Sequence, residues 1–156
     1  MATRWQDPNM VSRQEKIILE TLDKMSYELN ASHIFNQDDD YMVMLGFADD
    51  EFEPSKFVII QKAHEYDDQD VKLGMDKLHI QVEDQSRANY GGISSFTLDN
   101  SYLVIELELD TQSSLKVDGN IRIALEANHP ELESTLSVLK NIASDENIPF
   151  NSPRLG

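Results

Sequence analysis

The glycine pair in DQSRANYGGISSFTLD, residues 84–99, is the first candidate for chemistry, because glycine-rich turns can bind phosphate through backbone N–H groups. Tyr90-Gly91-Gly92-Ile93 lacks both the Gly-x-Gly-x-x-Gly spacing and the lysine of a P-loop. The following residues, SSFTL, have the pattern of a strand and not of a helix whose N-terminus could hold an anion. We therefore expect a structural role, in which one glycine adopts a positive φ or forms a β-bulge where the chain re-enters a strand.

Metal-binding and catalytic patterns are weak. The histidines at 33, 64, 79 and 129 include no His-Glu-x-x-His motif, and His79 with Glu83 on one strand face is a poor metal site. The aspartate-rich runs lack the order of an EF-hand loop, although weak calcium binding stays open. Ser94 and Ser95 have no base nearby in sequence, and carboxylate pairs are uninformative in so acidic a chain. We expect no enzyme activity and no cofactor.

Charge is the more informative property. Twenty-nine Asp and Glu against thirteen Lys and Arg give a net charge of −16. Such a field repels nucleic acid and anionic membranes, and it attracts a basic protein partner. Many of the acidic residues lie in connections beside aromatic residues, which suggests a partner-binding surface, although Asp is common in turns for purely local reasons. The predicted surface consists of Asp38, Asp39, Asp40, Tyr41, Asp49, Asp50, Glu51, Glu53, Tyr66, Asp67, Asp68, Asp70 and Tyr90.

The hydrophobic pattern predicts an α+β fold with a mainly antiparallel, meander-like sheet of five to seven strands between two amphipathic helices. We expect a single domain over residues 1–156, in which a β-rich core covers 31–127. The expected flanking segments are a loose leader at 1–11, a helix at 12–29, a second helix at 129–144 and a flexible tail at 145–156.

Three patterns support this assignment. Ser12 and Glu15 have capping-box spacing, and Ile18, Leu22, Met25 and Leu29 form a helical stripe after them. The segments 41–48 and 56–61 are apolar on both pleat faces, so we expect a helix to cover their second face. Later segments alternate, with Leu103, Ile105, Leu107 and Leu109 on one side of a single predicted strand.

Cysteine is absent, which favours a reducing compartment, and no apolar stretch approaches the roughly 18 residues of a membrane helix. A cytoplasmic location without membrane attachment is therefore expected.

Several short motifs, taken together, resemble a known family. They are Gly46-Phe47-Ala48, Gln61, Gln69-Asp70 with Leu73-Gly74, and above all Tyr90-Gly91-Gly92-Ile93. Over about residues 40–127 their order and spacing are similar to those of the immunity protein 10 family of bacterial polymorphic toxin systems. The resemblance implies a β-rich fold that binds and neutralises a cognate toxin domain, and it brings no catalytic residues.

Two other classes of function stay open at this point. An acidic secretion-effector chaperone would bind an unfolded segment by strand addition or along a groove. A small-molecule-binding domain would require a concave pocket with converging polar groups. A homo-oligomer is also compatible with the sequence.

Overall fold

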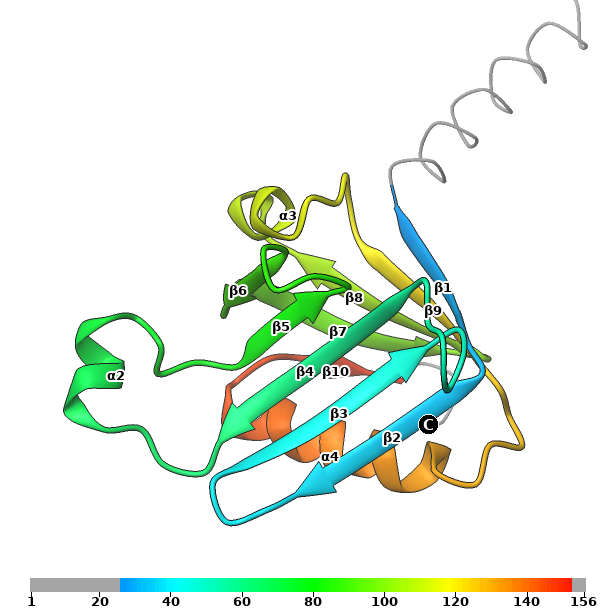
Figure 1. Cartoon of the computed structure of the whole chain (residues 1–156), viewed down its shortest axis with the longest axis horizontal. Helices are drawn as coiled ribbons and strands as arrows, with labels where there is room; N and C mark the ends of the chain where they lie inside the picture. Colours follow the sequence, from blue (N-terminus) through cyan, green and yellow to red (C-terminus); the bar gives the residue numbers. More distant parts are fainter. Residues whose placement is uncertain (1–25, 153–156) are drawn as a thin grey trace, which may run out of the picture.

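Two five-stranded β-sheets enclose the core in the part of the chain that the computed structural model describes, residues 26–152 (Figure 1). The strands are β1 (Tyr27–Ala31), β2 (His33–Asp38), β3 (Met42–Ala48), β4 (Phe57–Ala63), β5 (His79–Val82), β6 (Ala88–Tyr90), β7 (Ile93–Asp99), β8 (Tyr102–Leu107), β9 (Ile121–Leu125) and β10 (Phe150–Asn151). The helices are α2 (Asp68–Lys72), α3 (Leu109–Leu115) and α4 (Leu132–Asp145). The first sheet has the order β1-β9-β8-β7-β10, and the second has the order β2-β3-β4-β5-β6.

The two sheets differ in how their strands pair. Every pairing in the second sheet is antiparallel between strands that are neighbours in sequence. In the first sheet β7, β8 and β9 pair antiparallel, while β1 joins β9 and β10 joins β7 in parallel. The chain passes from the first sheet to the second at Ser32 and returns at Gly91 and Gly92. These two crossings place both sheets on one core.

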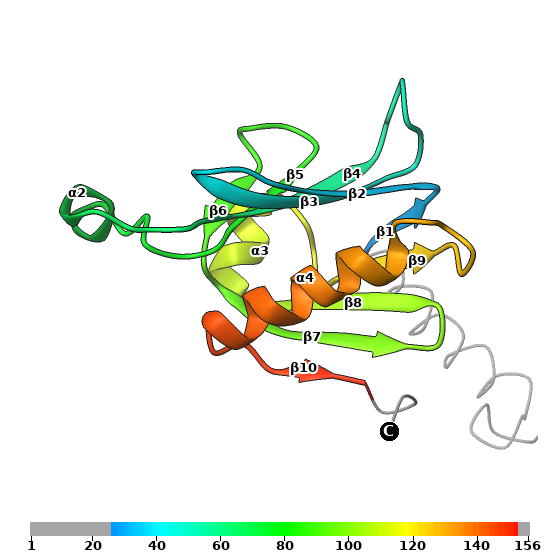
Figure 2. The ribbon, with the colours of Figure 1, turned by 90° about the horizontal axis from the view of Figure 1, so that it is seen from below.

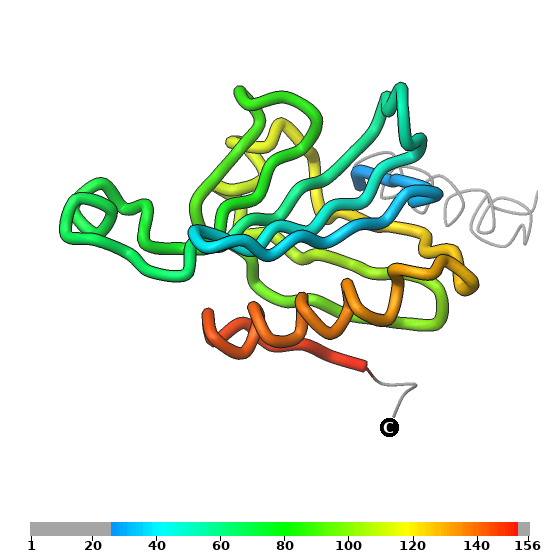
Figure 3. Tube along the Cα trace, turned by 60° about the horizontal axis from the view of Figure 1, so that its bottom comes forward, coloured from blue at the N-terminus to red at the C-terminus, as the bar shows by residue number. Residues whose placement is uncertain are grey.

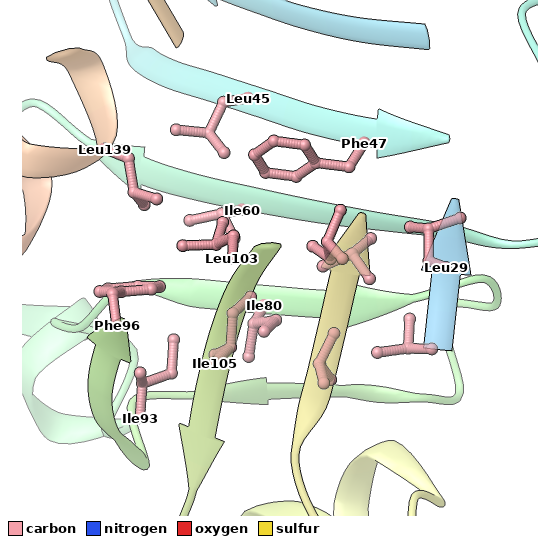
Figure 4. Packing of buried hydrophobic residues seen from close by; sticks show 14 of the residues in the cluster. Leu29, Leu45, Phe47, Ile60, Ile80, Ile93, Phe96, Leu103, Ile105 and Leu139 are labelled. Atoms are coloured by element: carbon pink, nitrogen blue, oxygen red, sulfur yellow. The ribbon is translucent and has the colours of Figure 1, made fainter. Parts of the chain in front are cut away.

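The core is the layer between the sheets, and the period-two alternation of the strands supplies its side chains. Leu45 of β3 and Ile60 of β4 face Leu103 and Ile105 of β8, and all four are fully buried (Figure 4). Each such side chain contributes about 1.5–3 kcal/mol through burial. Burial of the apolar side chains on the inner faces therefore stabilises the packing of one sheet on the other.

Helix α4 closes one side of this layer and lies on the inner side of the second sheet (Figure 2). Its residues Leu139 and Ile142 are buried in the core cluster. Asn36 of β2 donates its side-chain N–H to Thr135 Oγ1 at 2.9 Å, which satisfies a buried hydroxyl on the helix. The short helix α2, in contrast, projects beyond the end of the second sheet (Figure 3).

The α+β class and the C-terminal helix are confirmed, but the single meander-like sheet was wrong, because the strands divide into two sheets with two parallel pairings. Residues 12–25 of the expected N-terminal helix lie outside the described residues, and residues 27–29 begin β1. Leu109 starts α3 and does not extend β8, and the expected tail contains β10. The helix expected over the second face of β3 and β4 is absent from residues 26–152, since α4 packs on their inner face.

The glycine pair has the structural role expected from the sequence. Gly91 and Gly92 have φ values of 73° and 78°, and they carry the chain from β6 to β7. The Gly92 carbonyl accepts a hydrogen bond from the Glu108 backbone N–H at 3.0 Å. A Cβ atom at Gly92 would overlap the hydroxyl of the buried Thr111, so this position requires glycine for both conformation and space.

We predict that Gly92→Ala lowers the free energy of unfolding by about 2 to 4 kcal/mol, because it adds a steric clash to backbone strain. Gly74→Ala is the matched control, since Gly74 also has a positive φ of 71° but has no atom within 4 Å of an added Cβ. It should lose only about 1 kcal/mol. Urea unfolding of both variants measures the difference, and equal losses would show that the contact with Thr111 does not matter.

Candidate functional site

The structure divides the predicted acidic surface between the two ends of the second sheet. Residues 38–41 form the β2–β3 turn, and residues 66–70 lead into α2 at the same end. Residues 49–53 lie in the β3–β4 turn, at the opposite end of β3. Because β3 has seven residues, the two ends are separated by about 20 Å. The strand predicted over residues 41–48 already implies this separation, so the acidic residues before and after it could not form one continuous patch.

The first end forms a concave surface of about 600 Å³, which we call the acidic hollow. Its lining residues are Asp40, Tyr41, His64, Glu65, Tyr66, Asp67 and Asp70. The His64 backbone N–H donates to the Tyr41 carbonyl at 3.0 Å, and His64 Nε2 lies 2.6 Å from Asp38 Oδ1. These contacts join the two loops, so the hollow brings together most of the predicted residues of this end.

Several of these carboxylates stabilise the loops themselves. Asp39 Oδ1 accepts hydrogen bonds from the backbone N–H groups of Tyr41 and Met42, at 2.7 and 2.8 Å, and these bonds lower the pKa of Asp39. Asp67 and Asp70 form a reciprocal capping box at the start of α2. Asp40, Glu65 and Asp68 have no hydrogen bond or ion pair with any residue between 26 and 152 apart from regular backbone bonding.

Tyr66 links the acidic hollow to the body of the protein. Its hydroxyl donates to Glu146 Oε1 at 3.4 Å, and the same oxygen accepts the Leu78 backbone N–H at 2.6 Å. Burial and the neighbouring Glu146 carboxylate raise the pKa of Tyr66 to about 12. The hydrogen bond from this phenol to Glu146 positions the loop before α2.

The second acidic end is a turn held by its own aspartates. Asp49 accepts hydrogen bonds from the Ser55 hydroxyl at 2.6 Å and from the Lys56 backbone N–H at 3.2 Å, and these lower its pKa. Asp50 Oδ2 accepts from the Phe52 and Glu53 N–H groups, which shapes the tip of the turn. The Phe52 side chain at this tip is 84% exposed.

An apolar surface that the sequence did not predict lies beside this turn, on the outer face of the second sheet. We call it the aromatic hollow, a depression of about 220 Å³. The Phe35 ring lies over Gly46, where an added Cβ would clash with it, so the missing side chain at Gly46 makes room for the ring. The other lining residues are His33, Phe47, Ala48, Asp50, Glu51, Pro54, Phe57, Val58 and Ile59.

Tyr90 belongs to this outer face and to neither acidic end. It pairs with His79 across β5 and β6, and their ring centroids are 4.8 Å apart. His79 in turn pairs with Gln61 of β4. Burial lowers the pKa of His79, because desolvation disfavours the charged imidazolium. In the sequence, this surface is indicated by the apolar second face of segments 41–48 and 56–61. The same pattern also fits a strand pair covered by a helix, which is the arrangement that the sequence predicts.

Among residues 26–152, no cluster of three His, Asp or Glu side chains is arranged to hold a metal ion. Within the same range no helix has the length and apolar character needed to cross a membrane. In the described part of the chain, acidic loops lie at both ends of an apolar sheet face.

Comparison with models of known protein families gives a match to this chain. The family model described as immunity protein 10 matches residues 28–133, from β1 to the start of α4. This range is more than half of the chain and includes both crossings between the sheets. No significantly similar curated protein is found.

We predict that Asp39→Ala lowers the melting temperature at pH 7 more than Asp40→Ala does, because only Asp39 caps the β2–β3 turn. The pKa of Asp39 lies below its ordinary value of 3.8 in the folded protein. Its contribution is therefore complete above pH 3.8 and is lost as the pH falls through the folded-state pKa. Thermal unfolding from pH 7 down to pH 2.5 measures this, and a gap that persists unchanged at low pH would contradict it.

Proposed function

The chain belongs to the immunity protein 10 family, and on that premise we propose that it binds a cognate bacterial toxin domain and neutralises it by stoichiometric occlusion. The family implies a toxin as the partner. Occlusion requires an interface of about 1,600 Å² with a few buried anchors, and it requires no reaction by this chain. We accordingly propose a binding protein without catalytic residues.

The acidic character of the surface supports a basic partner. The net charge of −16 attracts a positively charged domain over long range. In the acidic hollow, Asp40 and Glu65 have no ion-pair partner among the described residues, and the exposed Tyr41 side chain stands beside them. A nuclease or another toxin with a nucleotide-binding cleft would present basic residues of the kind that fit this hollow.

The proposed contact surface includes both acidic ends of the second sheet. The β3–β4 turn contributes Asp49, Asp50, Glu51 and Glu53, and the first end contributes the carboxylates of residues 38–40 and 67–70. Charges of this kind mainly raise the association rate, whereas buried apolar contacts supply most of the affinity. The absence of cysteine agrees with a protein that meets its toxin in the reducing cytoplasm.

The direct test is co-expression with the cognate toxin domain, which is to be sought first in the neighbouring reading frame. The full-length chain should restore the growth of cells that produce this domain, and the two purified proteins should form a 1:1 complex on gel filtration. Absence of both rescue and complex would refute the proposed function.

The role of charge is tested by the double variant Asp40→Lys/Glu65→Lys, because both side chains are exposed and have no hydrogen bond or ion pair within the described part of the chain. Its association rate with the toxin domain should fall at least about tenfold at low salt, and the salt dependence of this rate should weaken. Stopped-flow mixing at several ionic strengths measures both quantities.

The matched control is Glu126→Lys/Glu133→Lys, which changes the net charge equally at exposed positions before and within α4. It should change the association rate by less than about threefold. If the two double variants behave alike, only the net charge matters and the acidic hollow is not a contact.

A further inference from the structure

The outer face of the second sheet, here called the open face, carries no charged side chain in any of its five strands. Its positions alternate with the buried ones, and they include Phe35, Met44, Ile59, Gln61, His79 and Tyr90. None of them is Asp, Glu, Lys or Arg, although these residues make up 27% of the chain. Depletion of charge together with aromatic residues and Met is the composition of the core of a protein–protein interface.

The outer face of the first sheet provides the contrast. There Arg122 forms an ion pair with Glu28 at 3.6 Å and stacks on Tyr102 with 4.1 Å to the ring centroid. Glu106 accepts a hydrogen bond from Ser95 at 2.7 Å. Charged groups on that face are thus exposed and satisfied by their neighbours, as on an ordinary solvated sheet. The open face, in contrast, carries no such charged groups on its strands.

From this difference we propose that the open face is the surface on which the toxin domain docks, an inference that rests on the proposed function and adds its anchor. The aromatic hollow receives an apolar side chain of the toxin that is flanked by Lys or Arg. The floor of this hollow includes Phe35, Phe57 and Ile59, while Asp50 and Glu51 stand at its rim.

The carboxylates at the rim of the aromatic hollow favour an occupant that carries a basic residue beside its apolar side chain. Glu51 has no hydrogen bond or ion pair to any described side chain, and Asp50 bonds only to backbone N–H groups of its own turn. Neither carboxylate is therefore paired with a cationic side chain of the described residues, although both lie beside an apolar depression. A basic residue next to an apolar anchor satisfies both features at once.

The open face lies between the two acidic ends of the second sheet. It extends along strands of up to seven residues and across five strands, a plane of about 20 Å by 20 Å. This plane of about 400 Å² is about half of the roughly 800 Å² per partner of a standard interface, so the loops at each end would have to supply the rest. The β3–β4 turn rises from the sheet on the side away from the first sheet (Figure 2), so it borders the face.

Because the natural chain has no cysteine, single cysteines can report directly on contact. Gln61→Cys places a thiol at the centre of the open face, and Val104→Cys places one on the outer face of the first sheet. Each full-length variant is labelled with a small maleimide, alone and with a saturating amount of the inactivated cognate toxin domain. Binding should slow labelling at residue 61 at least about tenfold and change it at residue 104 less than about twofold.

Two labelling results would overturn the inference. Unchanged labelling at residue 61 in a demonstrated complex would mean that the toxin docks elsewhere, while the proposed function would survive. Slow labelling at residue 61 in the free protein would mean that another segment of the chain or a second copy already covers the open face. If the wild-type chain forms no complex, the proposed function itself fails.

Affinity gives a second, independent readout. Ile59→Lys should raise the Kd for the toxin domain about 100-fold or more, because it places a charge in the apolar anchor site, whereas Val104→Lys should leave it within about threefold. Circular dichroism and melting curves identify variants that fail to fold. A folded Ile59→Lys variant that binds like the wild type would refute the anchor, and Tyr90→Ala, at a position 38% exposed, provides a milder test of the same face.

Discussion

The shared core of the two sheets is the constraint on which the rest of the structure depends. Every strand has two faces, and the inner faces bury Leu45, Phe47, Leu103 and Ile105 against one another. This packing works only if the chain can pass from one sheet to the other, which it does at Ser32 and at the glycine pair. The core requires only the inner faces to be apolar, so the residues of the outer faces can vary according to function.

Sequence periodicity located most strands, because alternation reports directly which side of a strand is buried. It could not show which strands share a sheet, since that depends on contacts between distant segments. The helical stripe that ended at Leu29 was misleading for a similar reason: Leu29 is buried, but in β1, where Leu29 and Ala31 alternate with exposed residues. The resemblance carried by Tyr90-Gly91-Gly92-Ile93 was the more reliable guide to fold and family.

Acidic residues in this protein have two physical roles that composition cannot separate. Asp39, Asp49 and Asp67 accept backbone N–H groups and hold turns, whereas the carboxylates of Asp40, Glu65 and Glu51 have no hydrogen-bond or ion-pair partner within residues 26–152. Only the hydrogen bonds of the folded chain distinguish the groups. The two-sided apolar strands show the same ambiguity, because a face that avoids charge fits a helix of the same chain as well as it fits another protein.

The most direct measurement of the central claim uses a methionine that the open face already contains. Full-length chain carrying ¹³C-methyl methionine is titrated with the unlabelled, inactivated toxin domain, and the methyl resonances are followed by NMR. The Met44 resonance should shift and stop changing at one equivalent, because this side chain lies on the open face beside Gln61. A complex that forms while the Met44 resonance stays in place would contradict the claim.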